Sequence, residues 1–368
     1  MRWRFGASLL AVAGIGLASG AAAPAAAPPS KCITDYDDAT RPTFFRELRR
    51  LGVRTWGSGI NWPDVVVGRP RRPRDPNDPA YHWSAALDRQ VARSVANGIE
   101  PVLHVNGAPE WANGGRSTQW APRPSDYASF MVAAMRHYSR VRRWQVFAEP
   151  SNPVNFLPQG RNGARLYARI LDAAYAAMHG VRRDAVVIGA TLHPSGNDAG
   201  YGTSVRTWLR EMRLPSGSAP RMDLFGINPY TERAVDVRAP LRPGRVDIDD
   251  LDWLVGRLDR IYPGRRLRLF ISEFGWNTEH GAIGWGFYVS RAEQATRLRR
   301  SYALARRLGR VDTLCWYQLY DAPPDTLGGY AVNWTSGLRL FRGGRKPAYR
   351  AFARIPAGPA RVGRAVGP

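Results

Sequence analysis

Two glutamates stand out because each directly follows a short apolar run. Glu149 follows residues 144–148, and Glu273 follows residues 269–272. A carboxylate in such a place is costly unless it is paired or hydrogen-bonded. Two carboxylates that face one cavity can cleave a glycosidic bond, since one protonates the leaving oxygen and the other attacks the anomeric carbon. The residues alone leave an alternative open, in which each glutamate forms a salt bridge with one of the many arginines.

The elements that must position these glutamates alternate along the chain as strands and helices. Eight strand–helix pairs without a linker predict a parallel sheet closed into a single α/β (β/α)8 TIM barrel. No G-x-G-x-x-G follows a predicted strand, so a dinucleotide-binding fold is not expected. The strands are expected at 32–35, 53–56, 101–106, 144–147, 186–190, 224–227, 267–271 and 313–319. The helices are expected at 44–51, 83–96, 125–138, 164–178, 205–212, 251–261, 292–308 and 347–353.

In such a barrel the chemistry sits at the carboxyl ends of the strands. Polar and aromatic side chains expected at or just beyond these ends are Arg54, His104, Asn106, Asn152, His193, Tyr230, Trp276 and Trp316. The sequence holds no H-E-x-x-H, Cys-x-x-Cys or G-x-S-x-G motif, and its six histidines lack metal-ligand spacing. We therefore expect no metal and no cofactor.

The first residues have the pattern of a secretory signal peptide. Arg2 and Arg4 precede an apolar run, and small residues follow up to position 27. The predicted organisation is a signal peptide at 1–27, a barrel domain at 28–355 and a disordered tail at 356–368. We expect a secreted or cell-envelope protein with no integral membrane segment after cleavage. Cys32 and Cys315 could form a disulfide in an oxidising compartment, but a buried, unpaired Cys315 is an equal alternative.

The formal net charge is +23, and two of the 53 basic residues are lysines. A field this positive attracts polyanions. The simplest interpretation of the charge is a solvated basic surface. The alternative is a polyanion contact, for which the charge favours an acidic polysaccharide, while no feature predicts a specific nucleic-acid site. One alternative function is therefore a basic surface protein that binds polyanions.

Two segments resemble motifs of the clan A glycoside hydrolases. Residues 144–152, Trp-Gln-Val-Phe-Ala-Glu-Pro-Ser-Asn, are similar to the fourth-strand motif that carries the acid/base of that clan. Residues 269–276, Leu-Phe-Ile-Ser-Glu-Phe-Gly-Trp, are similar to its seventh-strand nucleophile motif. The resemblance covers nearly the whole mature chain and extends to the family 39-like and family 5-like members. It implies a cofactor-free, retaining glycosidase in which Glu149 is the acid/base and Glu273 the nucleophile.

The resemblance also implies roles for other residues. Arg54 and Tyr230 would contact Glu273, which keeps that carboxylate ionised, and Trp316 would form a platform under the sugar. His104, Asn106, Asn152 and Trp276 are further candidates for substrate binding. Glu149 would have fewer donors and a higher pKa, and the two carboxyl groups would lie about 5–5.5 Å apart.

One position departs from the motif. The clan normally has asparagine directly before the acid/base, and this chain has Ala148. Either the substrate lacks a usable 2-hydroxyl there, or Asn152, Asn106 or His104 replaces the contact, or activity is weak. The departure motivates a second alternative, a non-catalytic carbohydrate-binding protein on a decayed glycosidase barrel.

Overall fold

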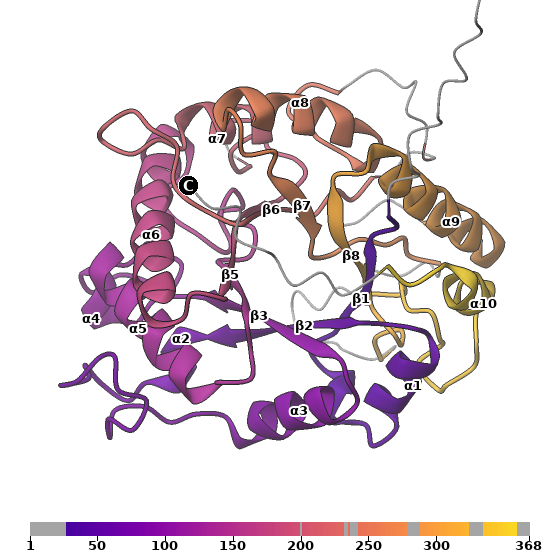
Figure 1. Cartoon of the computed structure of the whole chain (residues 1–368), viewed down its shortest axis with the longest axis horizontal. Helices are drawn as coiled ribbons and strands as arrows, with labels where there is room; N and C mark the ends of the chain where they lie inside the picture. Colours follow the sequence, from indigo (N-terminus) through magenta and orange to yellow (C-terminus); the bar gives the residue numbers. More distant parts are fainter. Residues whose placement is uncertain are drawn as a thin grey trace, which may run out of the picture.

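The computed structural model describes residues 27–198, 201–231, 235, 242–278, 288–323 and 334–358. Eight strands close a barrel in sequence order, each parallel to both neighbours (Figure 1). This confirms the predicted (β/α)8 fold. The strands are β1 (Ser30–Thr34), β2 (Thr55–Asn61), β3 (Glu100–Asn106), β4 (Arg143–Val146), β5 (Val186–Leu192), β6 (Leu224–Ile227), β7 (Arg268–Ile271) and β8 (Val311–Tyr317). Nearly all of the predicted signal peptide, 1–27, and most of the predicted tail, 356–368, lie outside the described residues.

Helices surround this barrel (Figure 1). They are α1 (Phe44–Arg50), α2 (Trp62–Val65), α3 (Ala85–Ala96), α4 (Glu110–Asn113), α5 (Pro124–His137), α6 (Gly160–Val181), α7 (Val205–Glu211), α8 (Leu251–Ile261), α9 (Arg291–Leu308) and α10 (Pro347–Arg354). Their starts follow ordinary capping chemistry: the Ser84 and Ser290 side chains accept from the backbone N–H three residues ahead, at the beginning of α3 and α9. None of the described helices is both long and apolar enough to cross a membrane.

The second strand lies further along the chain than its sequence suggests. It was expected at 53–56 but spans Thr55–Asn61. The strand contains Gly57 and Gly59, and glycine weakens the sequence pattern from which a strand is predicted. The barrel requires both: a Cβ at Gly57 would lie 2.5 Å from the Thr34 hydroxyl, and one at Gly59 would lie 2.2 Å from Nε2 of His104. The carboxyl end of β2 is therefore Asn61.

The barrel interior holds an apolar cluster that includes a disulfide. The cluster contains side chains from six strands, and side chains of that many strands can contact one another only inside the barrel. Cys32 and Cys315 are register partners on β1 and β8, the pair that closes the barrel, and their sulfurs are bonded. The open question about these cysteines is thus answered in favour of the disulfide. The cluster consists of Cys32, Val102, Val186, Ile188, Leu224, Phe270 and Cys315.

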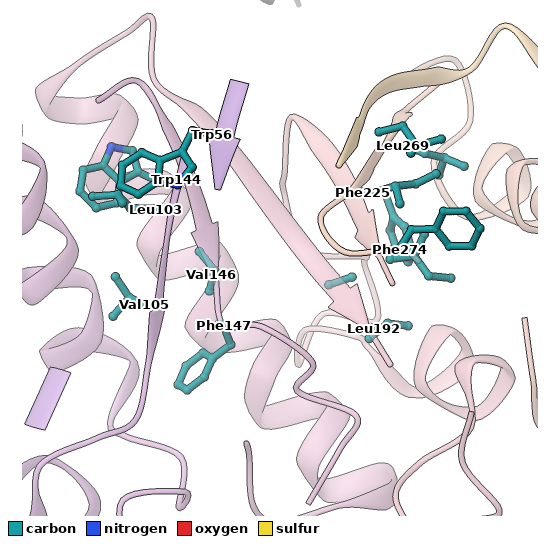
Figure 2. Packing of buried hydrophobic residues seen from close by; sticks show 14 of the residues in the cluster. Trp56, Leu103, Val105, Trp144, Val146, Phe147, Leu192, Phe225, Leu269 and Phe274 are labelled. Atoms are coloured by element: carbon teal, nitrogen blue, oxygen red, sulfur yellow. The ribbon is translucent and has the colours of Figure 1, made fainter. Parts of the chain in front are cut away.

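A second, larger core lies between the barrel and its helices. Trp144, Val146 and Phe147 from the fourth strand–loop unit belong to it, as do Trp56 and Leu103 (Figure 2). Alternation along each strand sends neighbouring side chains to the two cores in turn. The outer core therefore fixes which residues of each strand can face the barrel mouth.

Both lysines are buried and tie the end of the chain to the barrel. The Lys31 ammonium donates to the carbonyls of Phe352 (2.8 Å), Ile355 (3.1 Å) and Leu51. Lys346 forms an ion pair with Asp321 (2.6 Å). A compact ammonium with three donors suits such clustered oxygens better than a planar guanidinium does.

Candidate active site

Glu149 and Glu273 lie just beyond the carboxyl ends of β4 and β7. Glu149 has a φ of 49°, a left-handed conformation that is strained for a non-glycine residue and occurs at functional sites. Two backbone bonds hold it there, from its N–H to the Thr191 carbonyl (2.9 Å) and from the Asn152 N–H to its own carbonyl (2.9 Å). Both carboxylates are partly buried. Repulsion from Glu149 contributes to the raised pKa of Glu273, so the two charges interact across the barrel mouth.

Two tyrosine hydroxyls hold Glu273. Tyr36 donates to Oε1 over 2.6 Å, and Tyr230 donates to Oε2 over 3.3 Å. Burial, followed by repulsion from Glu149, raises the pKa of Glu273 to about 7 against the lowering effect of both hydroxyls. The expected contact with Tyr230 is confirmed. Tyr36 was not predicted, although it follows the first strand at its carboxyl end.

Two amides hold Glu149. Asn228 donates to Oε1 over 3.0 Å, and Asn152 donates to Oε2 over 3.3 Å. The Asn228 carboxamide in turn accepts from the Ser272 hydroxyl over 2.6 Å. The expectation that Glu149 has fewer donors than Glu273 is wrong, since each carboxylate has two.

Within the described part of the chain, neither glutamate forms an ion pair with an arginine or a lysine. The buried Arg143 instead pairs with Glu100 (2.9 Å) and Asp312 (2.8 Å) at the amino ends of the strands. Among the described residues, nothing supports the salt-bridge alternative for the two glutamates.

Arg54 is a correction. It precedes β2, is exposed, and bonds through its backbone N–H to the Lys31 carbonyl (2.9 Å) at the amino end of the barrel. Glu273 lies at the opposite end. Arg54 therefore does not supply the cation expected beside Glu273. The reason is that β2 begins after Arg54, whereas the prediction placed Arg54 near the carboxyl end of that strand.

Trp316 is a second correction. On β8, Cys315 belongs to the interior cluster, so Trp316 must point outward, where it is fully buried and donates to the Ser336 carbonyl (2.8 Å). Trp276 packs beside it with ring centroids 6.2 Å apart and is also fully buried. Neither indole is open to a ligand, so the expected platform at Trp316 and the expected substrate contact at Trp276 are wrong.

A different set of aromatic rings surrounds the carboxylates. The half-buried Trp334 ring lies 5.7 Å from Tyr230 and 5.2 Å from Tyr317, centroid to centroid. Tyr317 lies 6.1 Å from Tyr36. Trp334 was missed because it lies in a connection beyond β8, where no strand pattern marks it.

His104 and Asn106 lie toward the carboxyl end of β3. His104 contacts Tyr36 edge-on, with 5.6 Å between ring centroids, and both line a small cavity with Ser272. Burial lowers the pKa of His104 to about 4, so its imidazole is neutral at physiological pH. The Asn106 carboxamide oxygen accepts from the Ala148 N–H over 2.7 Å. Asn106 therefore lies next to the position where the motif lacks its asparagine.

One acidic cluster among the described residues has ligand-like geometry. Oxygens of Asp247, Asp249 and Asp250 lie within 4.8 Å of one another. Arg242 (2.5 Å) and Arg245 (3.3 Å) form ion pairs with Asp247, so these two arginines supply positive charge to the cluster without a metal ion. That no metal is needed stays a prediction.

No protein-family model and no curated protein matches the sequence. Solved structures match at low identity. A family 39 glycoside hydrolase from Bacteroides cellulosilyticus WH2 aligns with a TM-score of 0.62 and 20% identity over 89% of this chain and 63% of its own. A monomeric beta-xylosidase from Caulobacter crescentus CB15 aligns with a TM-score of 0.58 and 18% identity over 89% of this chain and 69% of its own. A beta-glucosidase from Exiguobacterium marinum aligns with a TM-score of 0.57 and 16% identity over 87% of this chain and 86% of its own. This chain thus spans less than two thirds of the first of these proteins, and the likeness confirms the barrel fold.

Proposed function

We propose that this chain, with the barrel fold of family 39 glycoside hydrolases, is a retaining glycosidase acting on a poly- or oligosaccharide. The observation that carries the proposal is the meeting of two partly buried carboxylates at the barrel mouth, close enough for the charge of Glu149 to raise the pKa of Glu273. Ion pairs satisfy neither carboxylate within the described residues, so both are available for chemistry.

In the proposed reaction, Glu273 attacks the anomeric carbon while Glu149 protonates the departing oxygen. Water then hydrolyses the glycosyl–enzyme ester, with Glu149 removing the proton of that water. Tyr36 and Tyr230 hold the attacking carboxylate through both oxygens. Asn228 and Asn152 do the same for the acid/base. Each carboxylate is thereby oriented before substrate arrives.

The sugar would lie against the aromatic group of Trp334, Tyr230 and Tyr317. A half-buried indole offers an apolar face to a ring with axial C–H bonds, and the tyrosine hydroxyls offer hydrogen bonds. Ala148 supplies no amide to a 2-hydroxyl. Asn106 is the residue that we expect to replace it, because its carboxamide is anchored on the Ala148 N–H.

We further propose that the protein is exported to the cell envelope or secreted. The Cys32–Cys315 disulfide supports this, since disulfides persist in oxidising compartments. The basic start and apolar run before residue 27 fit a signal peptide. The net charge of +23 favours an acidic polysaccharide as the substrate.

The test is hydrolysis of a panel of neutral and acidic glycans, with Glu273→Gln and Glu149→Gln as matched isosteric controls. We expect cleavage by the unaltered chain, at least a 1000-fold loss in Glu273→Gln, and a first product with the configuration of the substrate by proton NMR. Cleavage that survives both substitutions would contradict the assignment. Binding of a glycan without cleavage would favour the carbohydrate-binding alternative. Binding that is unchanged by both substitutions and is lost at high salt concentration would favour the polyanion-binding alternative.

A further inference from the structure

A basic groove lies on the solvent-facing side of α6, away from the two glutamates. Its volume is about 570 Å³, and it runs between α6 and the segment that follows α7. Neither Glu149 nor Glu273 belongs to its lining, and the proposed function assigns it no role. Its walls include Arg165, Leu166, Arg169, Arg213, Leu214 and Pro215.

The arginines of α6 form a row along this groove. Arg161, Arg165 and Arg169 are spaced four residues apart, and all three are exposed. Side chains four residues apart lie on one face of a helix, about 6 Å apart along its axis. The intervening Ala164 and Ala168 are buried, which fixes the direction of the row. A straight row of cations matches a chain of repeated anions better than it matches one compact anion.

One carboxylate, Glu211 at the end of α7, is shared by three arginines. Nε of Arg210 lies 2.9 Å from Oε1, while Nε of Arg161 (3.5 Å) and Nη2 of Arg165 (3.8 Å) approach Oε2. The hydrogen bond from Arg210, followed by the charges of the three arginines, lowers the pKa of Glu211. The row therefore attracts a carboxylate already, but one negative charge does not neutralise three positive ones.

The other two arginines of the groove have no acidic partner. Within the described residues, neither Arg169 nor Arg213 forms an ion pair. Arg213 is held in place through one nitrogen, which donates to two carbonyls at the end of α7 (3.1 and 2.9 Å). The next acid along α6, Asp172, already binds both sides of the Arg221 guanidinium (2.8 Å each). Five arginines against one glutamate thus leave a local net charge of +4.

The chemistry of the walls favours a polysaccharide over a nucleic acid. Single-stranded nucleic acids bind where bases stack on aromatic rings, and none of the residues that line this groove is aromatic. Leu166, Leu214 and Pro215 offer aliphatic surface to the C–H groups of a sugar. A guanidinium binds a carboxylate through two parallel hydrogen bonds, so carboxylates on successive sugars suit the row of arginines.

We propose that the groove of Arg165, Arg169 and Arg213 is a binding site for a linear polysaccharide whose sugars carry carboxylates. Binding there needs neither Glu149 nor Glu273, so the inference goes beyond the proposed function. The edge of the groove, Pro158, belongs to the loop that follows Glu149. A polysaccharide held in the groove is therefore anchored beside the loop that carries the proposed acid/base.

The test measures binding of the full chain to polygalacturonate over a series of salt concentrations. All proteins carry Glu273→Gln, so that cleavage does not interfere. Arg165→Gln/Arg169→Gln should weaken binding about tenfold, since two exposed ion contacts are lost. The fall of affinity with salt should also become shallower, because fewer counterions are released. Fully methyl-esterified polygalacturonate keeps the backbone without the charge, and its binding should not respond to the double substitution.

Arg300→Gln/Arg307→Gln is the matched control. It removes the same charge from exposed positions of α9, on the opposite side of the barrel from α6 (Figure 1). Salt screens such distant charges, so its effect should stay within about twofold. Equal losses in the two double variants would overturn the inference, because binding would then follow net charge alone.

Further measurements separate the ligand class and the stability of the variant. Single-stranded DNA that binds more tightly than polygalacturonate, and loses this affinity in Arg165→Gln/Arg169→Gln, would overturn the polysaccharide assignment. Dextran sulfate bound more tightly in the same groove-dependent way would overturn the preference for carboxylates. If the double variant unfolds at lower urea than the control, Arg169→Gln alone serves, because this arginine has no ion pair to lose; it should weaken binding by a smaller factor, and unchanged binding would refute the site. No turnover is needed, so failure of the proposed function leaves the result intact.

Discussion

Replacing Glu273 by glutamine should stabilise the folded protein in a pH-dependent way. The pKa of Glu273 is about 7 in the folded chain against an ordinary 4.5, so the folded state binds this proton more tightly than the unfolded state does. Between those two values the unfolded chain has released the proton and the folded chain has kept it. Stability from this group is therefore highest at low pH and falls as pH rises toward and through 7.

The size of the effect follows from the two pKa values. At about 1.36 kcal/mol per unit, the full difference is worth roughly 3 kcal/mol. At pH 5 the unfolded carboxyl is already largely ionised, and solvent reaches part of the folded side chain. We therefore expect the stability advantage of Glu273→Gln to grow by about 2 kcal/mol between pH 5 and pH 8. Glutamine is isosteric and keeps an oxygen for the Tyr36 hydroxyl, so little else changes.

The assay is urea unfolding of both proteins at pH 5 and pH 8, with the disulfide intact. Glu110→Gln is the control, because Glu110 is an exposed residue of α4. Its effect should be small and equal at the two pH values. If the difference between Glu273→Gln and the unaltered chain is the same at both pH values within about 0.5 kcal/mol, the burial of Glu273 does not carry the cost that we assign to it.

Three other outcomes follow from the same contacts. Tyr36→Phe removes the 2.6 Å donor to Glu273, so the acid limb of kcat/KM should move up by about one pH unit, and an unmoved limb would contradict the contact. Replacing Cys32 and Cys315 together by alanine should cost about 2–5 kcal/mol in urea unfolding while kcat stays within twofold at low temperature; an unchanged unfolding midpoint would argue against the bond. Arg54→Gln should leave kcat/KM within twofold, since this exposed side chain lies at the far end of the barrel, and a tenfold loss would place it in the site after all.

The barrel could be predicted because its signals are local. Apolar runs and helical spacing recur eight times, and the structure places a strand at each run. The second strand shows where this fails. Its glycines carry no side chain for a pattern to detect. The reasons for them, the Thr34 hydroxyl against Gly57 and the His104 ring against Gly59, exist only after β2 has paired with β1 and β3.

That single shift also explains the error at Arg54. Moving the end of the strand from residue 56 to Asn61 carries Arg54 from the expected barrel mouth to the opposite end. At β8 an error of one residue had the same effect, because Trp316 and Tyr317 point to opposite sides of the strand. The two glutamates were predictable, since a carboxylate directly after an apolar run is visible in the sequence. Their partners Asn228 and Tyr36 were not, because three-dimensional contacts alone connect them.

The burial of both lysines gives the folded chain an unusual chemical property. Reagents that acylate primary amines find no lysine side chain on its surface, because Lys31 and Lys346 are 1% and 2% exposed and the chain has no other lysine. Each ammonium becomes reactive only when the contacts of β1 or of the segment before α10 open. Mass spectrometry of acylated lysines would therefore measure how often each of these regions opens. The peptide with Lys31 would report on β1, and the peptide with Lys346 would report on the segment before α10.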